Sequence, residues 1–231
     1  MQNITIAIDG HSSTGKSTIA KQLAKELGYI YVDTGAMYRA VTLYAIQNDF
    51  ITADNFEVND FVMQLDKIHL EFEFNPELGF SEIYLNGINV EKPIRTMEVS
   101  GLVSTVSAVP EVRYQLVKQQ QKMGEGKGIV MDGRDIGTVV FPEAELKLFM
   151  TASAEIRAQR RYDELVQRGD EVNYEEVLCN VQERDYIDSN REDSPLMKAD
   201  DAIEFDNSNM TLEEQFDKIM NLVRMTLESQ E

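Results

Sequence analysis

The segment Gly10–Ser17 constrains this chain more than any other, because its sequence GHSSTGKS matches the full phosphate-loop pattern G-x-x-x-x-G-K-[ST]. It follows Ile4–Asp9, whose β-branched and small residues predict a short buried strand. It also opens a predicted helix from Lys16 to Leu27, which Gly28 is well placed to end. A helix N-terminus and curled backbone N–H groups both attract anions, so this context favours phosphate binding over an ordinary glycine turn.

The surrounding pattern predicts an α/β fold. Tyr29–Asp33 is a second short strand, and Thr34 is a suitable N-cap for a helix over Gly35–Gln47. Further strands are predicted at Gly128–Met131, Leu146–Met150 and Ala202–Phe205, and further helices at 96–121 with a break at Pro110, 154–168, 174–187 and 212–227. Strands that alternate with helices indicate a parallel sheet flanked by helices, of the P-loop NTPase type.

An antiparallel insertion interrupts this pattern. Ile68–Phe74 alternates as a half-buried strand does, and Asn86-Gly87 is a strong hairpin signal between Ser81–Leu85 and Ile88–Val90. Three consecutive antiparallel strands do not belong to the main sheet, which predicts a small inserted β subdomain. The expected core comprises residues 1–60, 95–152 and 192–231. The insert, residues 61–94, is expected to belong to a ligand-binding subdomain, and residues 153–191 are expected to form a helical lid with its adjoining helix.

The charge of the chain indicates a local anion site. The formal net charge is −19, so the surface as a whole should repel nucleic acid and anionic membranes. Seven of the eleven arginines nevertheless fall between Arg134 and Arg191. With no export signal, no membrane-spanning run and a single cysteine, Cys179, we expect a cytoplasmic protein in which Cys179 is an ordinary packing residue. No long exposed apolar stripe stands out in the sequence, so we expect a monomer.

The phosphate loop predicts a site for ATP and Mg²⁺. Lys16 should reach the β- and γ-phosphates, and the Ser17 hydroxyl should bind the metal ion. His11 lies among the loop positions that act through their backbone, so we expect no catalytic role for its side chain. Asp33 and Asp132 each follow a predicted strand, and either could contact Mg²⁺ through water. The expected ATP-binding positions in the loop are Gly10, His11, Ser12, Ser13, Thr14, Gly15, Lys16, Ser17 and Thr18.

Arginines on one predicted helix suggest phosphoryl transfer between two anions. Arg157 and Arg161 are four residues apart and share a helix face, with Arg160 adjacent. Their like charges repel unless an anion lies between them, and arginine suits phosphate oxygens better than lysine. A solvated basic face is the alternative interpretation.

Several segments together resemble the bacterial cytidylate kinases. Asp33–Arg39 is similar to their D-[ST]-G-x-x-Y-R segment, and Asp132–Val140 to their DGRD-x-GTVV segment. Glu183–Arg191 resembles their E-R-D-x-x-D-x-x-R helix. Ser104 and Arg113, with Pro110 between them, match a further segment, and the long insert is typical of the bacterial type. The resemblance covers essentially the whole chain, although a proline is common in that family where His11 stands.

The resemblance implies roles for individual residues. The phosphate end of CMP would be held by Thr34, Tyr38, Arg39, Arg134 and Arg184. The cytosine edge would be read by Ser104, Arg113 and Asp135, and the sugar would be held by Asp188 and Arg191. Arg157, Arg160 and Arg161 would belong to a mobile lid over ATP. The implied catalytic residues are Lys16, Arg134, Arg157, Arg161 and Arg184.

The implied activity is transfer of a phosphoryl group from ATP to CMP or dCMP, with Mg²⁺ as the cofactor. A different acceptor (UMP, AMP or a small metabolite), a nucleotide-dependent regulator and a nucleic-acid-binding protein are the alternatives. The chain has no N-K-x-D guanine-reading motif and carries a strong negative charge, which disfavour a GTPase and a nucleic-acid protein. For Asp135, a structural ion pair with Arg134 or another residue is the alternative to base reading.

Overall fold

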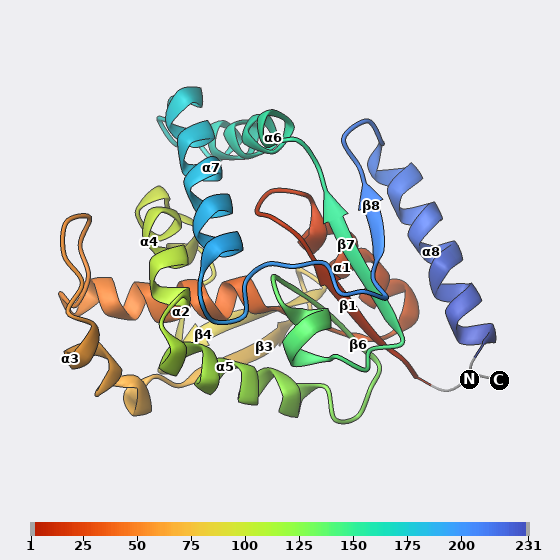
Figure 1. The fold of residues 1–231 in the computed structure, drawn as a ribbon, viewed down its shortest axis with the longest axis horizontal. Helices are drawn as coiled ribbons and strands as arrows, with labels where there is room; N and C mark the ends of the chain where they lie inside the picture. Colours follow the sequence, from red (N-terminus) through yellow and green to blue (C-terminus); the bar gives the residue numbers. More distant parts are fainter. Residues whose placement is uncertain (1–2, 230–231) are drawn as a thin grey trace. The chain divides into compact units, whose positions relative to one another are not determined.

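Strand β1 (Thr5–Asp9) lies at the centre of a five-stranded sheet with the order β2-β6-β1-β7-β8 (Figure 1). The structure is a computed structural model that describes residues 3–229. Strand β1 runs parallel to β6 (Ile129–Gly133) and to β7 (Leu146–Thr151), and β7 runs parallel to β8 (Ile203–Asp206). The fifth strand is β2 (Ile30–Asp33). Adjacent parallel strands bring their carboxyl ends to one edge, where the phosphate loop begins.

The chain divides into two units. The first comprises residues 1–32 and 124–231 and is called the phosphate-loop unit; the second comprises residues 33–123 and is called the insert unit. The parallel sheet and the inserted antiparallel sheet confirm the predicted fold class. The boundaries of core, insert and lid given above stay predictions.

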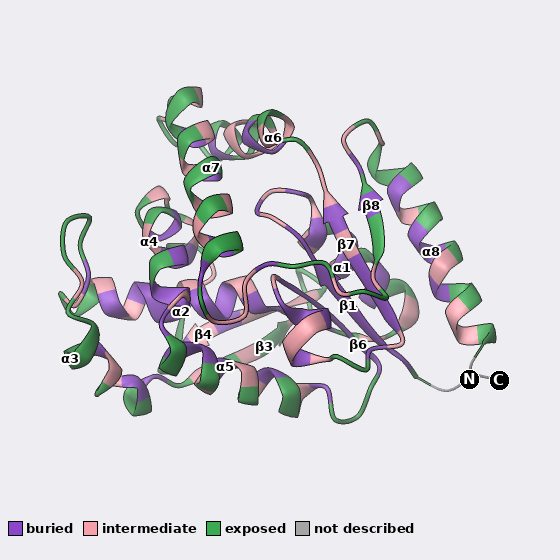
Figure 2. Ribbon diagram, in the orientation of Figure 1, coloured by how far each residue is buried: buried purple, intermediate pink, exposed green. Residues whose placement is uncertain are grey.

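Two helices cover one face of the parallel sheet. Helix α1 (Lys16–Leu27) and helix α8 (Leu212–Glu228) pack Ile19, Leu23, Ile219 and Val223 against Ile6 and Ile8 of β1 and the preceding Ile4 in one buried cluster. Figure 2 shows these strands buried and the outer side of α8 exposed. Each large aliphatic side chain buried in this way stabilises the fold by about 1.5–3 kcal/mol. Helix α8 begins with a capping box formed by Thr211 and Glu214.

The phosphate-loop unit also contains a helical pair and a π-helix. Helix α6 (Ala154–Gln167) packs against helix α7 (Tyr174–Asn190) (Figure 1). The rings of Tyr162 and Tyr174 meet edge to face, with their centres 6.0 Å apart. After β6 the chain forms a π-helical turn, η3 (Ile136–Val140). The sequence did not predict this turn, because π-helices are rare and occur mostly as single turns.

The insert unit contains a three-stranded antiparallel sheet and a set of helices. The sheet joins β3 (Leu70–Asn75), β4 (Phe80–Leu85) and β5 (Ile88–Asn89), with Leu85 opposite both Leu70 and Ile88. The rings of Phe50 and Phe56 lie 5.8 and 5.6 Å from the fully buried Phe61. The remaining elements are α2 (Thr34–Gln47), α3 (Val58–Val62), η1 (Leu65–Lys67), η2 (Pro93–Arg95), α4 (Met97–Ser107) and α5 (Pro110–Met123).

Two expectations were wrong. Helix α2 is capped by Asp33, whose carboxylate accepts a 2.8 Å hydrogen bond from the N–H of Ala36, and Thr34 is already the first helical residue. The last residue of strand β2 therefore also caps helix α2, and no further residue lies between the two elements. Cys179 is exposed, because α7 turns Val177 and Val181 inward and leaves position 179 outside.

Among residues 3–229, no helix is both long enough and apolar enough to cross a bilayer.

Candidate active site

Glycines shape the phosphate loop where it leaves β1. Gly10 has φ of 144°, and a Cβ there would lie 2.2 Å from the carbonyl oxygen of Met150 on β7. Any side chain would therefore force the loop away from the sheet. Gly15 has φ of 90° and occupies the N-cap of α1, where no side chain caps the helix. The first backbone N–H groups of α1 thus face the loop, as an anion-binding helix terminus requires.

Lys16 folds back over this loop and is buried. Its Nζ donates to the carbonyl oxygen of His11 at 2.6 Å and to Oγ1 of Thr14 at 3.3 Å. Burial lowers the pKa of Lys16 to about 7, and the charge of Arg134 acts in the same direction, whereas nearby carboxylates led by Asp132 oppose this. The ammonium is held among charged groups and is shielded from solvent.

Asp132 lies directly beside the first turn of α1. The hydroxyl of Ser17 donates to Oδ2 of Asp132 at 2.9 Å, and the hydroxyl of Tyr31 donates to Oδ1 at 2.8 Å. These groups supply oxygen ligands of the kind that Mg²⁺ prefers. Among the described residues no cluster of three or more His, Cys, Asp or Glu could hold a metal ion by itself.

Asp9, the last residue of β1, accepts hydrogen bonds from the start of the π-helical turn. Its two carboxylate oxygens each accept a 2.7 Å hydrogen bond, from the N–H groups of Ile136 and Gly137. Burial raises the pKa of Asp9 to about 7, although both backbone N–H groups favour the ionised form. The segment that carries Arg134 and Asp135 is thereby tied to the residue that precedes the phosphate loop.

A network of opposite charges links β6 to α7. Nε of Arg134 donates to Oδ2 of the buried Asp188 at 2.8 Å. Burial acts to raise the pKa of Asp188, but the charges of Arg134, Arg184 and Arg191 outweigh it and lower that pKa. Arg191 also lies 4.0 Å from Asp135. The phosphate-loop unit therefore brings together those of its own residues that the resemblance assigns to CMP.

Arg157 on α6 is buried against the loop and α7. It donates to both oxygens of Asp185, at 2.9 and 2.5 Å, and to the carbonyl oxygen of Ser12 at 3.3 Å. Nδ1 of His11 lies 3.1 Å from the same carboxylate. Burial acts to raise the pKa of Asp185, but His11 and Arg157 outweigh it and lower the pKa to about 2.

The two other arginines of α6 have partners of their own. Arg160 donates to Oδ1 and to the carbonyl oxygen of Asn207, both at 3.0 Å, and more weakly to the carbonyl oxygen of Thr14. Arg161 donates to Oε2 of Glu164 at 3.0 Å. Protein oxygens thus contact all three arginines, so their charges do not need a bound anion to coexist on one helix.

In the insert unit, Asp33 joins two arginines. Oδ2 of Asp33 accepts from Nη2 of Arg39 at 3.1 Å and from Nη2 of Arg95 at 3.0 Å. A Cβ on Gly35 would lie 2.9 Å from Nη1 of Arg39, so glycine lets that guanidinium fold back over the helix start. Burial acts to raise the pKa of Asp33, but the charges of Arg39 and Arg95 outweigh it and hold that pKa well below its usual range.

Two of the three residues expected to read cytosine, Ser104 and Arg113, belong to the insert unit, whereas Asp135 belongs to the phosphate-loop unit. Arg113 is buried, donates to the carbonyl oxygen of Ser107 at 3.1 Å and lies 5.6 Å from the ring centre of Tyr38. Ser104 and Thr34 are also buried. Ser104 lies on α4 and Arg113 on α5, which begins at Pro110.

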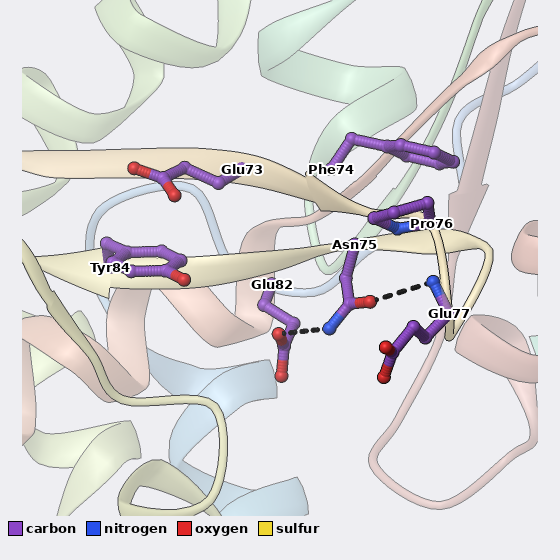
Figure 3. Close-up of a pocket in the computed structure, with 7 residues that line it drawn as sticks. All are labelled: Glu73, Phe74, Asn75, Pro76, Glu77, Glu82 and Tyr84. Atoms are coloured by element: carbon purple, nitrogen blue, oxygen red, sulfur yellow. Dashed lines mark hydrogen bonds between the residues drawn. The ribbon is translucent and has the colours of Figure 1, made fainter.

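A separate pocket of about 290 Å³ opens on the hairpin of β3 and β4 (Figure 3). Three glutamates line it, and Asn75 donates to Glu82 across the hairpin. These carboxylates would repel phosphate groups, so this pocket does not suit a nucleotide. Its lining residues are Glu73, Phe74, Asn75, Pro76, Glu77, Glu82 and Tyr84.

Sequence reasoning missed four residues that hold the expected site residues. Asp9 directly precedes the phosphate loop, which is a signal that could have found it. Asp185 stands inside the recognised E-R-D segment but was given no role. Arg95 and Asn207 lie outside the recognised motifs, and only the folded chain brings them to Asp33 and Arg160.

Comparison with known proteins places these motifs in one family. The model of the family "Cytidylate kinase" matches residues 6–225. A cytidylate kinase of Flavobacterium johnsoniae is 69% identical over 223 residues, which cover 96% of this chain and 97% of that protein. A cytidylate kinase of Bacteroides fragilis is 60% identical and covers 95% of this chain and 96% of that protein.

A solved structure shares the general fold. It is an uncharacterized protein from Eubacterium ventriosum, 12% identical, with a TM-score of 0.50 over 97% of this chain and 99% of that chain. At this identity the likeness concerns the fold alone.

Proposed function

The chain belongs to the cytidylate kinase family, and we propose that it transfers the γ-phosphoryl group of ATP to CMP or dCMP, giving ADP and CDP or dCDP. The observation that carries this proposal is the joining of two sets of residues in one unit. The charges of Arg134 and Arg184 both act to lower the pKa of Lys16 in the phosphate loop. The family pattern assigns these two arginines to the acceptor phosphate. A phosphate loop without such acceptor arginines would fit an ATPase equally well.

ATP is bound in this proposal by the loop of residues 10–18 and by α6. Backbone N–H groups of the loop and of the first turn of α1 hold the phosphates, and Lys16 neutralises charge on the β- and γ-phosphates. Arg157, Arg160 and Arg161 complete the donor side. Their contacts with carbonyl oxygens of the loop and with Asp185 support a place beside the loop for Arg157 and Arg160.

The roles proposed for CMP follow the family pattern residue by residue. The phosphate of CMP meets Thr34, Tyr38, Arg39, Arg134 and Arg184. Its base meets Ser104, Arg113 and Asp135, and its sugar meets Asp188 and Arg191. A carboxylate accepts from the exocyclic amino group of cytosine, whereas uracil would present a carbonyl oxygen to it and leave both groups unpaired.

Mg²⁺ is bound in this proposal by the Ser17 hydroxyl, with Asp132 contributing through water. The contact between these two side chains supports Asp132 over Asp33, whose carboxylate is engaged by two arginines. When bound, Mg²⁺ withdraws charge from the phosphate oxygens of the transition state.

Catalysis needs no nucleophilic side chain, because the acceptor is already a phosphate oxygen and is anionic at neutral pH. That oxygen attacks the γ-phosphorus in line, the bond to the β–γ bridging oxygen breaks, and ADP leaves with its electron pair. The arginines and Lys16 orient both anions and stabilise the charge that spreads over the transferring group. No covalent enzyme intermediate forms. The cytoplasmic location and the monomeric state stay predictions.

A coupled assay of ADP release tests this function. Purified protein with ATP and Mg²⁺ is given CMP, dCMP, UMP, AMP or no acceptor. We expect rapid release with CMP or dCMP, much slower release with UMP or AMP, and little without an acceptor. Release that is independent of any acceptor would identify an ATPase, and preference for UMP or AMP would refute the assignment of the base-reading set.

A further inference from the structure

We propose that Asp9 is a positioning residue that holds the segment carrying Arg134 and Asp135 in register with the phosphate loop, and so contributes to the selection of cytosine. The inference rests on the proposed reading of cytosine by Asp135. Asp9 makes no contact with either nucleotide in this proposal. It acts through the backbone of Ile136 and Gly137.

The position of Asp9 suits this task. It ends β1 and immediately precedes Gly10, which starts the phosphate loop. Its carboxylate is buried and accepts both N–H groups that follow Asp135, each at 2.7 Å. One side chain therefore fixes the distance between the donor loop and the residues that follow β6. Two short hydrogen bonds to one carboxylate also set the orientation of the turn, which a single bond would not.

Asp9 replaces a cap that the turn does not supply for itself. Asp135 occupies the N-cap of η3, yet its side chain forms no capping hydrogen bond. A residue of this type usually turns its carboxylate onto the N–H groups two or three residues ahead. Because Asp9 already accepts the N–H groups of Ile136 and Gly137, Asp135 keeps its carboxylate for other partners, with Arg191 at 4.0 Å.

Close packing keeps the turn from adjusting around Asp9. A Cβ on Gly137 would lie 3.3 Å from Oδ2 of Asp9 and 3.2 Å from Cδ of Lys147, so the turn fits tightly between two buried side chains. Because the packed turn cannot form new contacts, weaker hydrogen bonds to Asp9 would displace Asp135 or increase its mobility. Displacement of a reading group by a fraction of an ångström reduces discrimination between substrates.

Acceptor selectivity separates this role from a merely structural one. A structural carboxylate, once removed, lowers the amount of active enzyme and reduces turnover with CMP and UMP alike. A positioning carboxylate changes the ratio of kcat/KM for CMP to kcat/KM for UMP. It raises KM for CMP while leaving KM for ATP close to that of the unaltered protein.

The test compares Asp9→Asn with Glu145→Gln in the full chain. Glu145 is a matched control, because it also accepts a backbone N–H of β1, that of Thr5 at 2.8 Å, and our proposal gives it no role with either nucleotide. We expect Asp9→Asn to lower the CMP/UMP ratio roughly ten-fold, about 1.4 kcal/mol of discrimination. We expect Glu145→Gln to leave it unchanged. An unchanged ratio in Asp9→Asn, with equal losses of kcat for both acceptors, would overturn the inference.

Two further variants keep the test decisive. Gly137→Ala places a methyl group against the carboxylate of Asp9 without altering Asp9 itself. It should also lower the CMP/UMP ratio, even where Asp9→Asn does not fold. Asp135→Ala tests the underlying proposal. If it lowers the ratio and neither Asp9→Asn nor Gly137→Ala does, the role of Asp9 is refuted and base reading stands; if it leaves the ratio unchanged, base reading by Asp135 fails and the inference fails with it.

Discussion

The hydroxyl of Ser17 donates a 2.9 Å hydrogen bond to Oδ2 of Asp132, which joins the first turn of α1 to the carboxyl end of β6. The phosphate-loop pattern requires a hydroxyl at position 17, but it says nothing about which carboxylate lies beside it. The parallel pairing of β1 with β6 decides this, since it sets Ile8 opposite Asp132 and brings β6 to its end beside the loop.

The first prediction concerns the metal ion. Asp132→Asn keeps the shape of the side chain and removes its charge, so Mg²⁺ should bind more weakly. We expect the Mg²⁺ concentration for half-maximal activity to rise roughly ten-fold, as it does when a group that orients a metal's ligands is lost. A titration of initial rate against Mg²⁺ at fixed ATP measures this. Tyr31→Phe removes only the second hydrogen bond to this carboxylate and should shift the curve less. Superimposable curves for Asp132→Asn and the unaltered protein would exclude Asp132 from the metal site.

The second prediction concerns Lys16. Its Nζ donates to the carbonyl oxygen of His11 and to the hydroxyl of Thr14, both in the same loop, so its removal should spare the sheet and its core. Loss of a cation that stabilises developing charge should lower kcat on the order of 100- to 1,000-fold. We expect Lys16→Ala to retain the far-ultraviolet circular dichroism and the cooperative melting of the unaltered protein. Normal turnover in a folded Lys16→Ala variant would contradict the assignment of the phosphate loop.

The third prediction concerns stability and pH at Asp185. Its pKa is about 2 in the folded chain and 3.8 in an ordinary setting. The unfolded chain therefore binds a proton more readily than the folded chain in this range. The contribution of Asp185 to stability is fully present above about pH 5 and is lost as pH falls through pH 2. The excess stability of the unaltered protein over Asp185→Asn should accordingly shrink between pH 7 and pH 3, by less than about 1 kcal/mol because water screens this partly exposed carboxylate.

Urea unfolding at the two pH values measures this difference. Asp170→Asn is the matched control, because it removes an exposed carboxylate that pairs with an arginine, Arg168, at the surface. Exposed pairs contribute little, so its effect should be small at both pH values. A gap for Asp185→Asn that does not change with pH would show that the contacts with His11 and Arg157 do not stabilise the ionised carboxylate in the folded chain.

The sequence predicted elements well where one local signal dominates. Gly10–Ser17, the hairpin at Asn86-Gly87 and the helix break at Pro110 each depend on backbone conformations that few residue types allow. The structure places all three as expected. The fold class followed from the same signals, because alternating strands and helices have few stable arrangements.

Other features depend on long-range contacts that no local signal encodes. The buried carboxylate of Asp9 meets Ile136 and Gly137 at a separation of more than 120 residues, and Arg157 meets Asp185 across two helices. The exposure of Cys179 depends on which face of α7 packs inward, and the weak hydrophobic periodicity of that helix does not fix the face. Residue roles in nucleotide binding came from family resemblance rather than from composition or spacing.

The last prediction separates the two arginines that share Asp33. Under the proposed function Arg39 holds the acceptor phosphate, whereas Arg95 has no assigned contact with CMP and pairs with both Asp33 and Glu91. Arg39→Ala should raise KM for CMP at least ten-fold, since a charge-assisted contact with phosphate contributes about 1.5–3 kcal/mol, and should leave KM for ATP nearly unchanged. Arg95→Ala removes a cation from the same carboxylate, so it should lower the melting temperature while KM for CMP stays within about three-fold. Steady-state kinetics with CMP and ATP varied in turn distinguish the two. An equal rise of KM for CMP in both variants would mean that Arg95 also contributes to acceptor binding, because a merely shared partner predicts unequal effects.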